Sequence, residues 1–582
     1  MAKPDAVVRK NRVAAIVVAG LVVTAVGSTI AQPRKPLRFE ISFPASLRPT
    51  PLDGRLLLVV STKNDKEPRL QIGEALDTQQ FFGVDIDGLA PGQTAEVDES
   101  AQGYPRDSLA EVPEGDYYVQ AIVNVYETFH RDDGHVLKMH MDQGEGQHWN
   151  TSPGNLLSEA KKIRVERSGE AIRIELTRIL PPITSPKDAR YVKHFRIESP
   201  VLSKFWGRPM YLGGVVLLPE GFYEHPNARY PVMYYQGHFK SSFATPVEFR
   251  EQPPTPELKD DDRTLAEYSY KFYQDWTSGR LPRMLIVSIQ HPNPFYDDSY
   301  AVDSANVGPY GRAITQEFIP YVEKTYRAIG QPWARVLTGG STGGWEALAL
   351  QVFYPDLFNG SWCDCPDPVD FRAYQTVDLY KDKNAFWMDS QWKLVPRPST
   401  RQTDGLLIST LRDDARLEAT LGSHGRSTEQ LDIWQAVYSP VGSDGYPQPI
   451  FDKQTGAIDH EVAEYWRQNY DLRYIMERDW KTLGPKLVGK LHVKVGTSDT
   501  YYLDRAVHML EDFLESTRQP GRGPYYGGDF EYGPYQPHCY SGDPSVPVKI
   551  SRLTINQRYM PQMAEWMVRT APKDADVKSW KY

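Results

Sequence analysis

A glycine-rich turn between a strand pattern and a helix pattern constrains the fold of this chain most. Residues 335–346 read RVLTGGSTGGWE, and Gly339, Ser341 and Gly343 within them fit the pattern G-x-S-x-G. This pattern sets a serine on a strained turn, and its glycines remove side chains that would collide where strand and helix approach closely. We therefore predict a short strand, a sharp turn that presents Ser341, and a helix whose N-terminal end favours negative charge beside the serine.

The turn pattern alone does not establish a function, because glycine-rich turns also connect strands and helices without any chemical role. Acidic residues and histidines follow Ser341 downstream, in the order serine, acid, histidine that accompanies nucleophilic serines on such turns. This order favours a nucleophilic serine over a purely structural turn.

Length and charge limit the classes of function. The chain has 582 residues, of which 40% are hydrophobic and 24% charged, and its formal net charge is −9. The length predicts two or three domains. The negative charge and the lack of a basic stretch argue against a nucleic-acid partner. No phosphate-binding glycine pattern follows a strand, so we expect no nucleotide, and we expect no other cofactor.

The first 31 residues have the features of a secretory signal. Four Lys or Arg residues precede an apolar run from Val13 to Val26, and small residues end at Ala31, where cleavage would leave Gln32 first. The apolar run is short for a membrane span, which needs about 20 residues. We expect a cleaved signal, a secreted or periplasmic protein and no stable membrane insertion afterwards. An uncleaved anchor is the alternative.

Residues 32–183 carry short strand patterns separated by turn clusters, without a long helical period. This predicts an N-terminal antiparallel β-sandwich domain of immunoglobulin-like kind. Several histidines fall between positions 130 and 148, but their spacing matches no metal-ligand signature, so we expect no metal site there. Proline-rich residues 181–186 predict a stiff linker.

From residue 184 to residue 582, strand patterns alternate with helix patterns, which predicts an α/β sheet covered by helices. An insertion at about 366–485 interrupts this alternation and is rich in tryptophan and tyrosine. Long segments of this kind often have a function, so a lid or pocket wall is one interpretation. The other is a packed helical decoration whose tryptophans belong to its core.

The segment from about 190 to 575 resembles the putative esterase family, also called the esterase D or enterochelin-esterase-like family, of the α/β-hydrolase superfamily. The resemblance is carried by YPVMYYQG at 230–237, by the elbow GGSTGG at 339–344, and by a late Gly-x-x-Asp that a histidine follows. It covers about two thirds of the chain and leaves the N-terminal domain out. It implies an α/β-hydrolase catalytic domain at 184–582 and the cleavage of a carboxylic ester.

The resemblance also implies a catalytic triad. The family's acid follows a late strand, where Asp499 stands, with Asp504 as the second choice and helix capping as the structural alternative for Asp499. The family's histidine lies in a loop near the end, which His538 fits. In this arrangement His538 takes the proton of Ser341, and Asp499 orients the imidazole and stabilises its charged form.

Backbone N–H groups of Thr342 and His238 are the candidate oxyanion hole, because the first follows the serine and the second follows a buried strand. Candidate substrate contacts are Asn306, Tyr310 and Trp345. Asn306 and Tyr310 lie in a loop that follows the predicted strand preceding the elbow, and such loops gather at the ligand-binding edge of an α/β sheet. We expect no metal at this site.

Three cysteines occur, Cys363, Cys365 and Cys539. The first two are one residue apart on a predicted strand, so they should point to opposite faces and not pair with each other. A disulfide from Cys539 to one of them would tie the histidine loop to the strand beyond the elbow. Three reduced thiols are the alternative.

The leading hypothesis is a secreted serine hydrolase that cleaves a carboxylic ester through an acyl-enzyme on Ser341, in the manner of a feruloyl or siderophore esterase. Two alternatives remain open: an acyltransferase with the same triad, and a catalytically inactive binding protein on the hydrolase fold. The expected partner is a small-molecule or polymer-linked ester. The sequence leaves the ester itself, the role of the N-terminal domain and the oligomeric state open.

Overall fold

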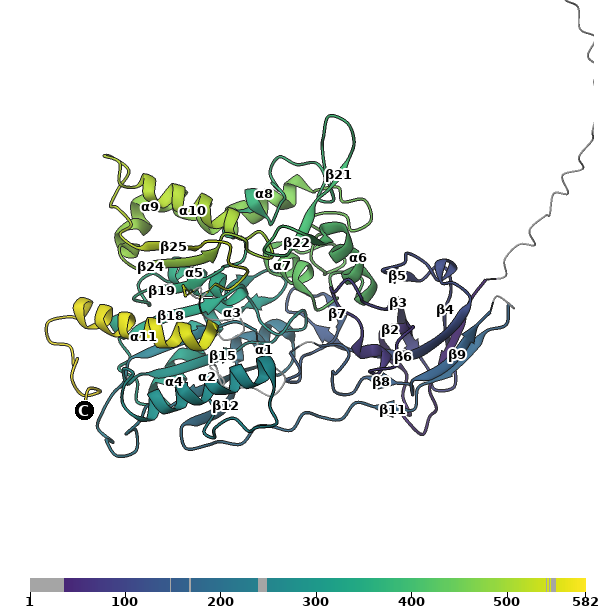
Figure 1. Cartoon of the computed structure of the whole chain (residues 1–582), viewed down its shortest axis with the longest axis horizontal. Coiled ribbons are helices and arrows are strands. Elements are labelled where there is room, and N and C mark those ends of the chain that lie inside the picture. Colours follow the sequence, from purple (N-terminus) through teal and green to yellow (C-terminus); the bar gives the residue numbers. More distant parts are fainter. Residues whose placement is uncertain are drawn as a thin grey trace, which may run out of the picture.

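The computed structural model describes residues 36–146, 148–166, 169–238, 249–540, 542–543, 545 and 551–582. The expected signal, residues 1–31, lies outside the described residues. Within these ranges no helix combines the length and the apolar character that a bilayer span requires. Figure 1 shows a strand-rich N-terminal region on one side of the molecule and a larger region of helices and strands on the other.

Two sheets form the described part of the N-terminal region. The larger has eight strands, in the order β11-β8-β6-β2-β3-β5 with β7 and β9 also paired to β6, and the smaller has the order β10-β1-β4. The strands are β1 (Phe39–Ser42), β2 (Leu52–Ser61), β3 (Gln80–Leu89), β4 (Thr94–Val97), β5 (Gln102–Tyr104), β6 (Gly115–His130), β7 (Val136–Met139), β8 (Leu156–Leu157), β9 (Lys161–Val165), β10 (Ile172–Glu175) and β11 (Arg178–Ile179).

Strand β2 is buried along almost its whole length because both of its faces are covered. One face, which includes Leu56, belongs to an apolar core that the larger sheet shares with the smaller one. The other face, which includes Leu57, lies in a cluster with Leu417 and Leu421 of helix α6 (Leu411–Leu421), part of the expected insertion. Since side chains alternate between the faces of a strand, a strand covered on both faces has a continuous apolar run.

One strand pair departs from the antiparallel expectation. β1 pairs with β4 antiparallel but with β10 parallel, with Phe39 opposite Ile172. Parallel neighbours need a crossover connection, and the chain between β1 and β10 passes through most of the larger sheet before it returns. Local patterns predict strands but not the direction in which distant strands pair. The immunoglobulin-like sandwich stays a prediction.

A second eight-stranded sheet, counted over the described residues, forms the centre of the α/β region in the order β12-β13-β15-β14-β18-β19-β24-β25. β13 is antiparallel to both of its neighbours, and every pairing from β15 to β25 is parallel. The interior strands β14, β15 and β19 are buried at every position, as expected where helices cover both faces of a parallel sheet. The bounds are β12 (Val192–Glu198), β13 (Tyr211–Leu217), β14 (Val232–Gln236), β15 (Leu285–Gln290), β18 (Arg335–Gly340), β19 (Ser361–Asp364), β24 (Leu491–Gly496) and β25 (Asp529–Gly533).

Helices pack on this sheet. They are α1 (Pro200–Trp206), α2 (Asp260–Thr277), α3 (Tyr310–Ala313), α4 (Ile319–Thr325), α5 (Thr342–Phe353), α10 (Asp504–Ser516) and α11 (Ser551–Thr570). Helix α5 is buried from Thr342 to Val352 and contacts β14, β18 and β19. Helices α2 and α11 pack against each other (Figure 1). A π-helical turn, Ile314–Phe318, separates α3 from α4. The strand and the helix on either side of Ser341, β18 and α5, therefore lie in the interior of the α/β region.

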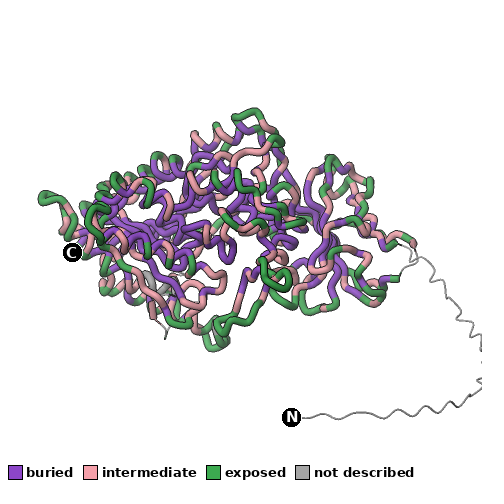
Figure 2. Tube along the Cα trace, turned by 90° about the horizontal axis from the view of Figure 1, so that it is seen from above, coloured by how far each residue is buried: buried purple, intermediate pink, exposed green. Residues whose placement is uncertain are grey.

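The expected insertion contains more regular structure than its sequence indicates. Over the described residues it holds α6, α7 (Gln430–Tyr438), α8 (His460–Asn469), α9 (Leu472–Leu487), β20 (Trp387–Met388), β21 (Val395–Pro396), β22 (Pro398–Arg401) and β23 (Leu407–Thr410), and the ladder β16 (Asp303–Ser304) with β17 (Gly308–Pro309) precedes it. Trp434 and Trp466 are buried in the main core, whereas Trp392 is 86% exposed. Figure 2 shows buried segments concentrated in the middle of the α/β region, with exposed segments around its rim.

Candidate active site

Ser341 stands on the strained turn that the sequence predicts. β18 ends at Gly340 and α5 begins at Thr342, and Ser341 between them has φ 60° and ψ −127°. Positive φ is uncommon for a residue with a side chain and costs on the order of 1–3 kcal/mol. A Cβ at Gly343 would lie 2.2 Å from the carbonyl oxygen of Gln236. The prediction of a strand, a sharp turn and a helix is confirmed.

His538 and Asp499 lie beside this serine in a continuous hydrogen-bonded chain. His538 Nε2 is 2.9 Å from Ser341 Oγ, and His538 Nδ1 is 2.8 Å from Asp499 Oδ2. Asp499 is fully buried, and its other oxygen, Oδ1, accepts backbone N–H groups of Tyr501 and Leu503 at 2.9 and 3.2 Å. Asp499 is not the N-cap of the following helix α10 (Asp504–Ser516), because that position is Leu503 and carries no side-chain cap hydrogen bond. Its Oδ1 instead holds the turn before the helix, while Oδ2 contacts the histidine.

The structure separates the chosen residues from the alternatives. Asp504, the second choice for the acid, pairs with Arg401 at 3.1 Å. His508 also follows Asp499 in the sequence, but its ring stacks on Tyr532 with centroids 4.3 Å apart. Chain order alone therefore admits two histidines, and the loop position of His538 together with its contact with Ser341 distinguishes it from His508, which lies on a helix.

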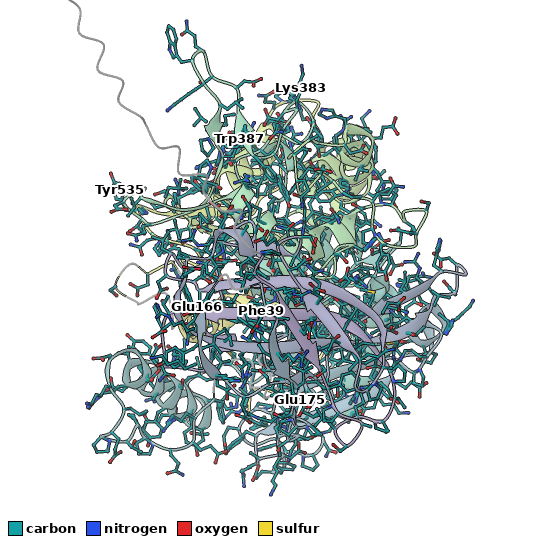
Figure 3. The ribbon with its side chains drawn as sticks, turned by 90° about the vertical axis from the view of Figure 1, so that its right-hand side faces the viewer. Phe39, Glu166, Glu175, Lys383, Trp387 and Tyr535 are labelled. Atoms are coloured by element: carbon teal, nitrogen blue, oxygen red, sulfur yellow. The ribbon has the colours of Figure 1, made fainter. Side chains whose placement is uncertain are left out.

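The surroundings of His538 shift the pKa of its imidazole ring. Burial lowers the pKa of His538, but the neighbouring Cys539 and the Asp499 carboxylate outweigh this effect and raise the pKa well above its ordinary value. Tyr535, three residues before His538, is 81% exposed and points outward at the edge of the molecule (Figure 3). The histidine thus lies at the half-buried end of a loop whose other end faces solvent.

The three cysteines divide between two places. The Sγ atoms of Cys365 and Cys539 are in contact, while Cys363 belongs to a different apolar cluster. All three are free thiols in this structure. The loop of His538 thus meets the chain beyond β19 through Cys365, not Cys363.

The side chains of the two candidate oxyanion residues form part of a polar network. His238 Nε2 lies 3.1 Å from Thr342 Oγ1, and His238 Nδ1 faces the carboxylates of Asp297 and Asp298 at 3.1 and 2.9 Å. Thr342 Oγ1 also lies 3.1 Å from Asp367 Oδ2. The network therefore joins the chain after β14, the loop after β15, the start of α5 and the chain after β19.

Sequence reasoning missed three acids of this network, Asp297, Asp298 and Asp367. Each follows a strand of the parallel part of the sheet, at the carboxyl edge where ligands of α/β proteins bind, and this position was the signal that could have found them. The insertion residues Gln430 and Trp434, which contact Asp367 at 3.2 Å each, carry no such signal.

The three candidate substrate contacts are buried side chains in this structure. Asn306 Nδ2 donates to the carbonyl oxygens of Ala436 and Ser439, and the Tyr310 hydroxyl donates to that of Pro292. The Trp345 ring packs between aromatic rings of the core. Their contact with a substrate stays a prediction.

Two groups of side chains in the described ranges have the donor types of a metal site. One is His238 with Asp297 and Asp298, and the other is His538 with two cysteines, with donor atoms within 4.8 Å of one another in each group. In the first group the histidine pairs with both carboxylates, and in the second the histidine is part of the chain to Ser341.

The fold and the site define the class of this protein as a mixed α/β protein with a serine-centred candidate site. The sheet is mostly parallel, the serine stands on a strained turn at its carboxyl edge, and a histidine–carboxylate pair lies beside that serine. Residues 209–405 match the model of the family described as putative esterase. The match confirms the resemblance seen in the sequence and supports an ester hydrolase. It includes Ser341, and it ends before Asp499 and His538.

Solved structures with detectable similarity include a ferulic acid esterase, at 15% identity and a TM-score of 0.35, covering 65% of this chain and 99% of that one. An S-formylglutathione hydrolase from Agrobacterium tumefaciens has 12% identity and a TM-score of 0.34, with coverages of 65% and 94%. The fluorophosphonate-binding serine hydrolase FphF from Staphylococcus aureus has 15% identity and a TM-score of 0.31, with coverages of 64% and 98%. Comparison with curated proteins gave no match.

Proposed function

We propose that this protein is a secreted serine hydrolase that cleaves a carboxylic ester through an acyl-enzyme on Ser341. The observation that carries the proposal is the continuous chain from Ser341 Oγ through His538 to Asp499, with contacts of 2.9 and 2.8 Å. The family match supports an ester as the substrate class.

In the first half-reaction, Ser341 Oγ attacks the ester carbonyl carbon while its proton passes to His538 Nε2. Asp499 accepts the Nδ1–H of the ring, holds its orientation and stabilises the imidazolium. Backbone N–H groups of Thr342 and His238 are the proposed donors to the oxyanion. His538 then protonates the alcohol oxygen, the ester C–O bond breaks, and the acyl group remains on Ser341.

In the second half-reaction, water takes the place of the alcohol. His538 accepts a proton from this water as its oxygen adds to the acyl carbonyl carbon. Collapse of the intermediate returns the proton to Ser341 Oγ and releases the carboxylic acid. The cycle consumes one ester and one water and restores the enzyme.

Aromatic rings flank both histidines and support a planar aromatic acyl group, as in a feruloyl or catecholate ester. Tyr296 lies edge-on to His238 with ring centroids 5.3 Å apart, and Tyr501 lies edge-on to His538 at 4.9 Å. Both tyrosines are partly exposed. Rings at such separations can offer edges and faces to a further aromatic group.

The proposal includes the domain organisation predicted from the sequence: a cleaved signal at 1–31, a β-sandwich domain at 32–183 and a catalytic domain at 184–582. Sequencing the N-terminus of protein recovered from the exported fraction tests the first part. Gln32 should be the first residue, and an intact N-terminus retained inside the cell would contradict secretion.

The activity is tested with a panel of p-nitrophenyl acyl esters, feruloyl sugars and a catecholate siderophore. The wild-type protein should hydrolyse at least one of them, and Ser341→Ala should lower kcat by about 10⁶. Adding an alcohol or sugar acceptor tests the acyltransferase alternative, which would yield a new ester instead of the acid. A wild-type protein that turns over no ester of the panel would favour the inactive binding protein.

A further inference from the structure

The two residues proposed as oxyanion donors also meet through their side chains. His238 Nε2 lies 3.1 Å from Thr342 Oγ1, and Thr342 Oγ1 lies 3.1 Å from Asp367 Oδ2. Thr342 is the first residue of α5, directly after Ser341. One hydroxyl group therefore joins both sides of the proposed oxyanion pocket.

The partners of these groups determine the direction of each hydrogen bond. His238 Nδ1 faces two carboxylates, those of Asp297 and Asp298, so Nδ1 carries a proton. Burial raises the pKa of Asp367, but its Oδ2 faces four donors, which favour the ionised form. An ionised carboxylate only accepts, so the Thr342 hydroxyl donates to it. The hydroxyl oxygen then accepts the Nε2–H of His238, which makes this ring an imidazolium.

The charges around His238 agree with this assignment. Burial lowers the pKa of His238, but the carboxylates of Asp297 and Asp298 outweigh it and raise the pKa well above its ordinary value. A positive ring beside the proposed pocket would also favour the negative charge that develops there.

Asp367, at the start of the insertion, connects the Thr342 hydroxyl to helix α7. Its Oδ2 also accepts the Tyr300 hydroxyl at 2.6 Å, Gln430 Nε2 at 3.2 Å and Trp434 Nε1 at 3.2 Å. Asp367 is 3% exposed, and both Gln430 and Trp434 lie on α7. The same carboxylate oxygen therefore holds a helix of the insertion and the residue next to Ser341.

We propose that Asp367 is a positioning residue. Through the Thr342 hydroxyl, which also holds the ring of His238, it keeps the backbone N–H groups of Thr342 and His238 at the separation an oxyanion needs. Helix α7 thereby supports the pocket through Asp367. The inference deepens the proposed function and rests on it. We call Asp367, Thr342 and His238 the oxyanion clamp. It acts on the transition state, because the charge it serves exists only after Ser341 has attacked.

Thr342→Val tests the oxyanion clamp, because valine has nearly the shape of threonine and keeps the backbone N–H. We expect kcat to fall by about 10- to 100-fold and KM to change by less than about threefold, since the lost interaction belongs to the transition state. Affinity for an aryl boronic acid, which forms a tetrahedral adduct on a serine, should fall by a similar factor. Asp367→Asn should act in the same direction.

Two further variants separate positioning from general stability. Thr342→Ser keeps the hydroxyl and should restore kcat to within about threefold of wild type, because its hydrogen bonds survive. Asp471→Asn is the matched control: Asp471 is a buried carboxylate that accepts the Tyr380 hydroxyl at 2.6 Å and the Phe371 N–H at 3.0 Å, away from the clamp. It should lower Tm and leave kcat and boronate affinity near wild type.

The outcomes are distinguishable. Wild-type kcat and boronate affinity in Thr342→Val and Asp367→Asn, in a protein that Ser341→Ala inactivates, would overturn the oxyanion clamp and leave the proposed function intact. The same holds if these variants lose only Tm, as Asp471→Asn does. Full activity in Ser341→Ala would overturn the proposed function, and the clamp with it.

Discussion

His538 Nε2 lies 2.9 Å from Ser341 Oγ although 197 residues separate the two along the chain. Ser341 follows β18, Asp499 follows β24 and His538 follows β25. These strands run parallel within one sheet, so their carboxyl ends meet at one edge. The contact therefore follows from the order of the strands in the sheet. Each of the three residues follows a different strand, so a substitution at one of them should leave the strands that position the other two in place.

Replacing Asp499 by asparagine should lower kcat by about 10⁴ while the fold is kept, because the amide turns an N–H toward His538 and favours the wrong tautomer of the ring. Asp504→Asn is the matched control, since Asp504 pairs with Arg401 instead. Steady-state kinetics on one ester measure both variants. An equal loss in the two would show that Asp499 has no special role.

The activity should depend on pH through His538. In the reduced protein, burial lowers the pKa of His538, but Cys539 and the Asp499 carboxylate outweigh burial and raise it well above the ordinary value. The neutral ring is the base that accepts the Ser341 proton, so kcat/KM should be low below the raised pKa and increase as pH rises through it. The acid limb of a kcat/KM profile should therefore lie above about pH 6.5. A limb at or below that pH contradicts the stated cause.

Cys365 and Cys539 should form a disulfide when the protein is oxidised, because their sulphur atoms are in contact and Cys363 lies in a different apolar cluster. Such a link restricts the unfolded chain and typically stabilises a fold by about 2–4 kcal/mol. Peptide mass mapping and thermal unfolding, with and without reductant, measure both effects. Cys363→Ala is the control that leaves the link intact. Three free thiols in oxidised protein, or a link at Cys363, would exclude this pairing.

Gly343→Ala should destabilise the protein and abolish activity. The new Cβ would lie 2.2 Å from the carbonyl oxygen of Gln236, a backbone atom of β14 that cannot move without shifting the strand. Gly73→Ala is the matched control, because nothing lies within 4 Å of its new Cβ. Unfolding temperatures of the two variants give the comparison. Wild-type stability in Gly343→Ala would refute the close approach of elbow and strand.

The elbow could be predicted from sequence because its signal is local. Gly339, Ser341 and Gly343 lie within five residues of one another, and each meets a steric requirement of the same turn. Asp499 follows a strand whose apolar pattern is also local. These residues could therefore be assigned positions before their mutual distances were known.

The rest of the site depends on contacts between distant segments, which local patterns do not encode. The four donors to Asp367 include Gln430 and Trp434, which belong to a helix more than sixty positions away. The parallel pairing of β1 with β10 has the same origin. The burial of Asn306, a candidate substrate contact, likewise results from its bonds to the end of α7.

The most direct test of the central claim is the residue that a fluorophosphonate modifies. Wild-type protein should gain one adduct, and peptide mass analysis should locate it on Ser341, because this hydroxyl is the one that His538 activates. Ser341→Ala should gain none, and His538→Ala should react far more slowly. An adduct on another residue of the wild-type protein, together with ester cleavage by Ser341→Ala, would contradict the account.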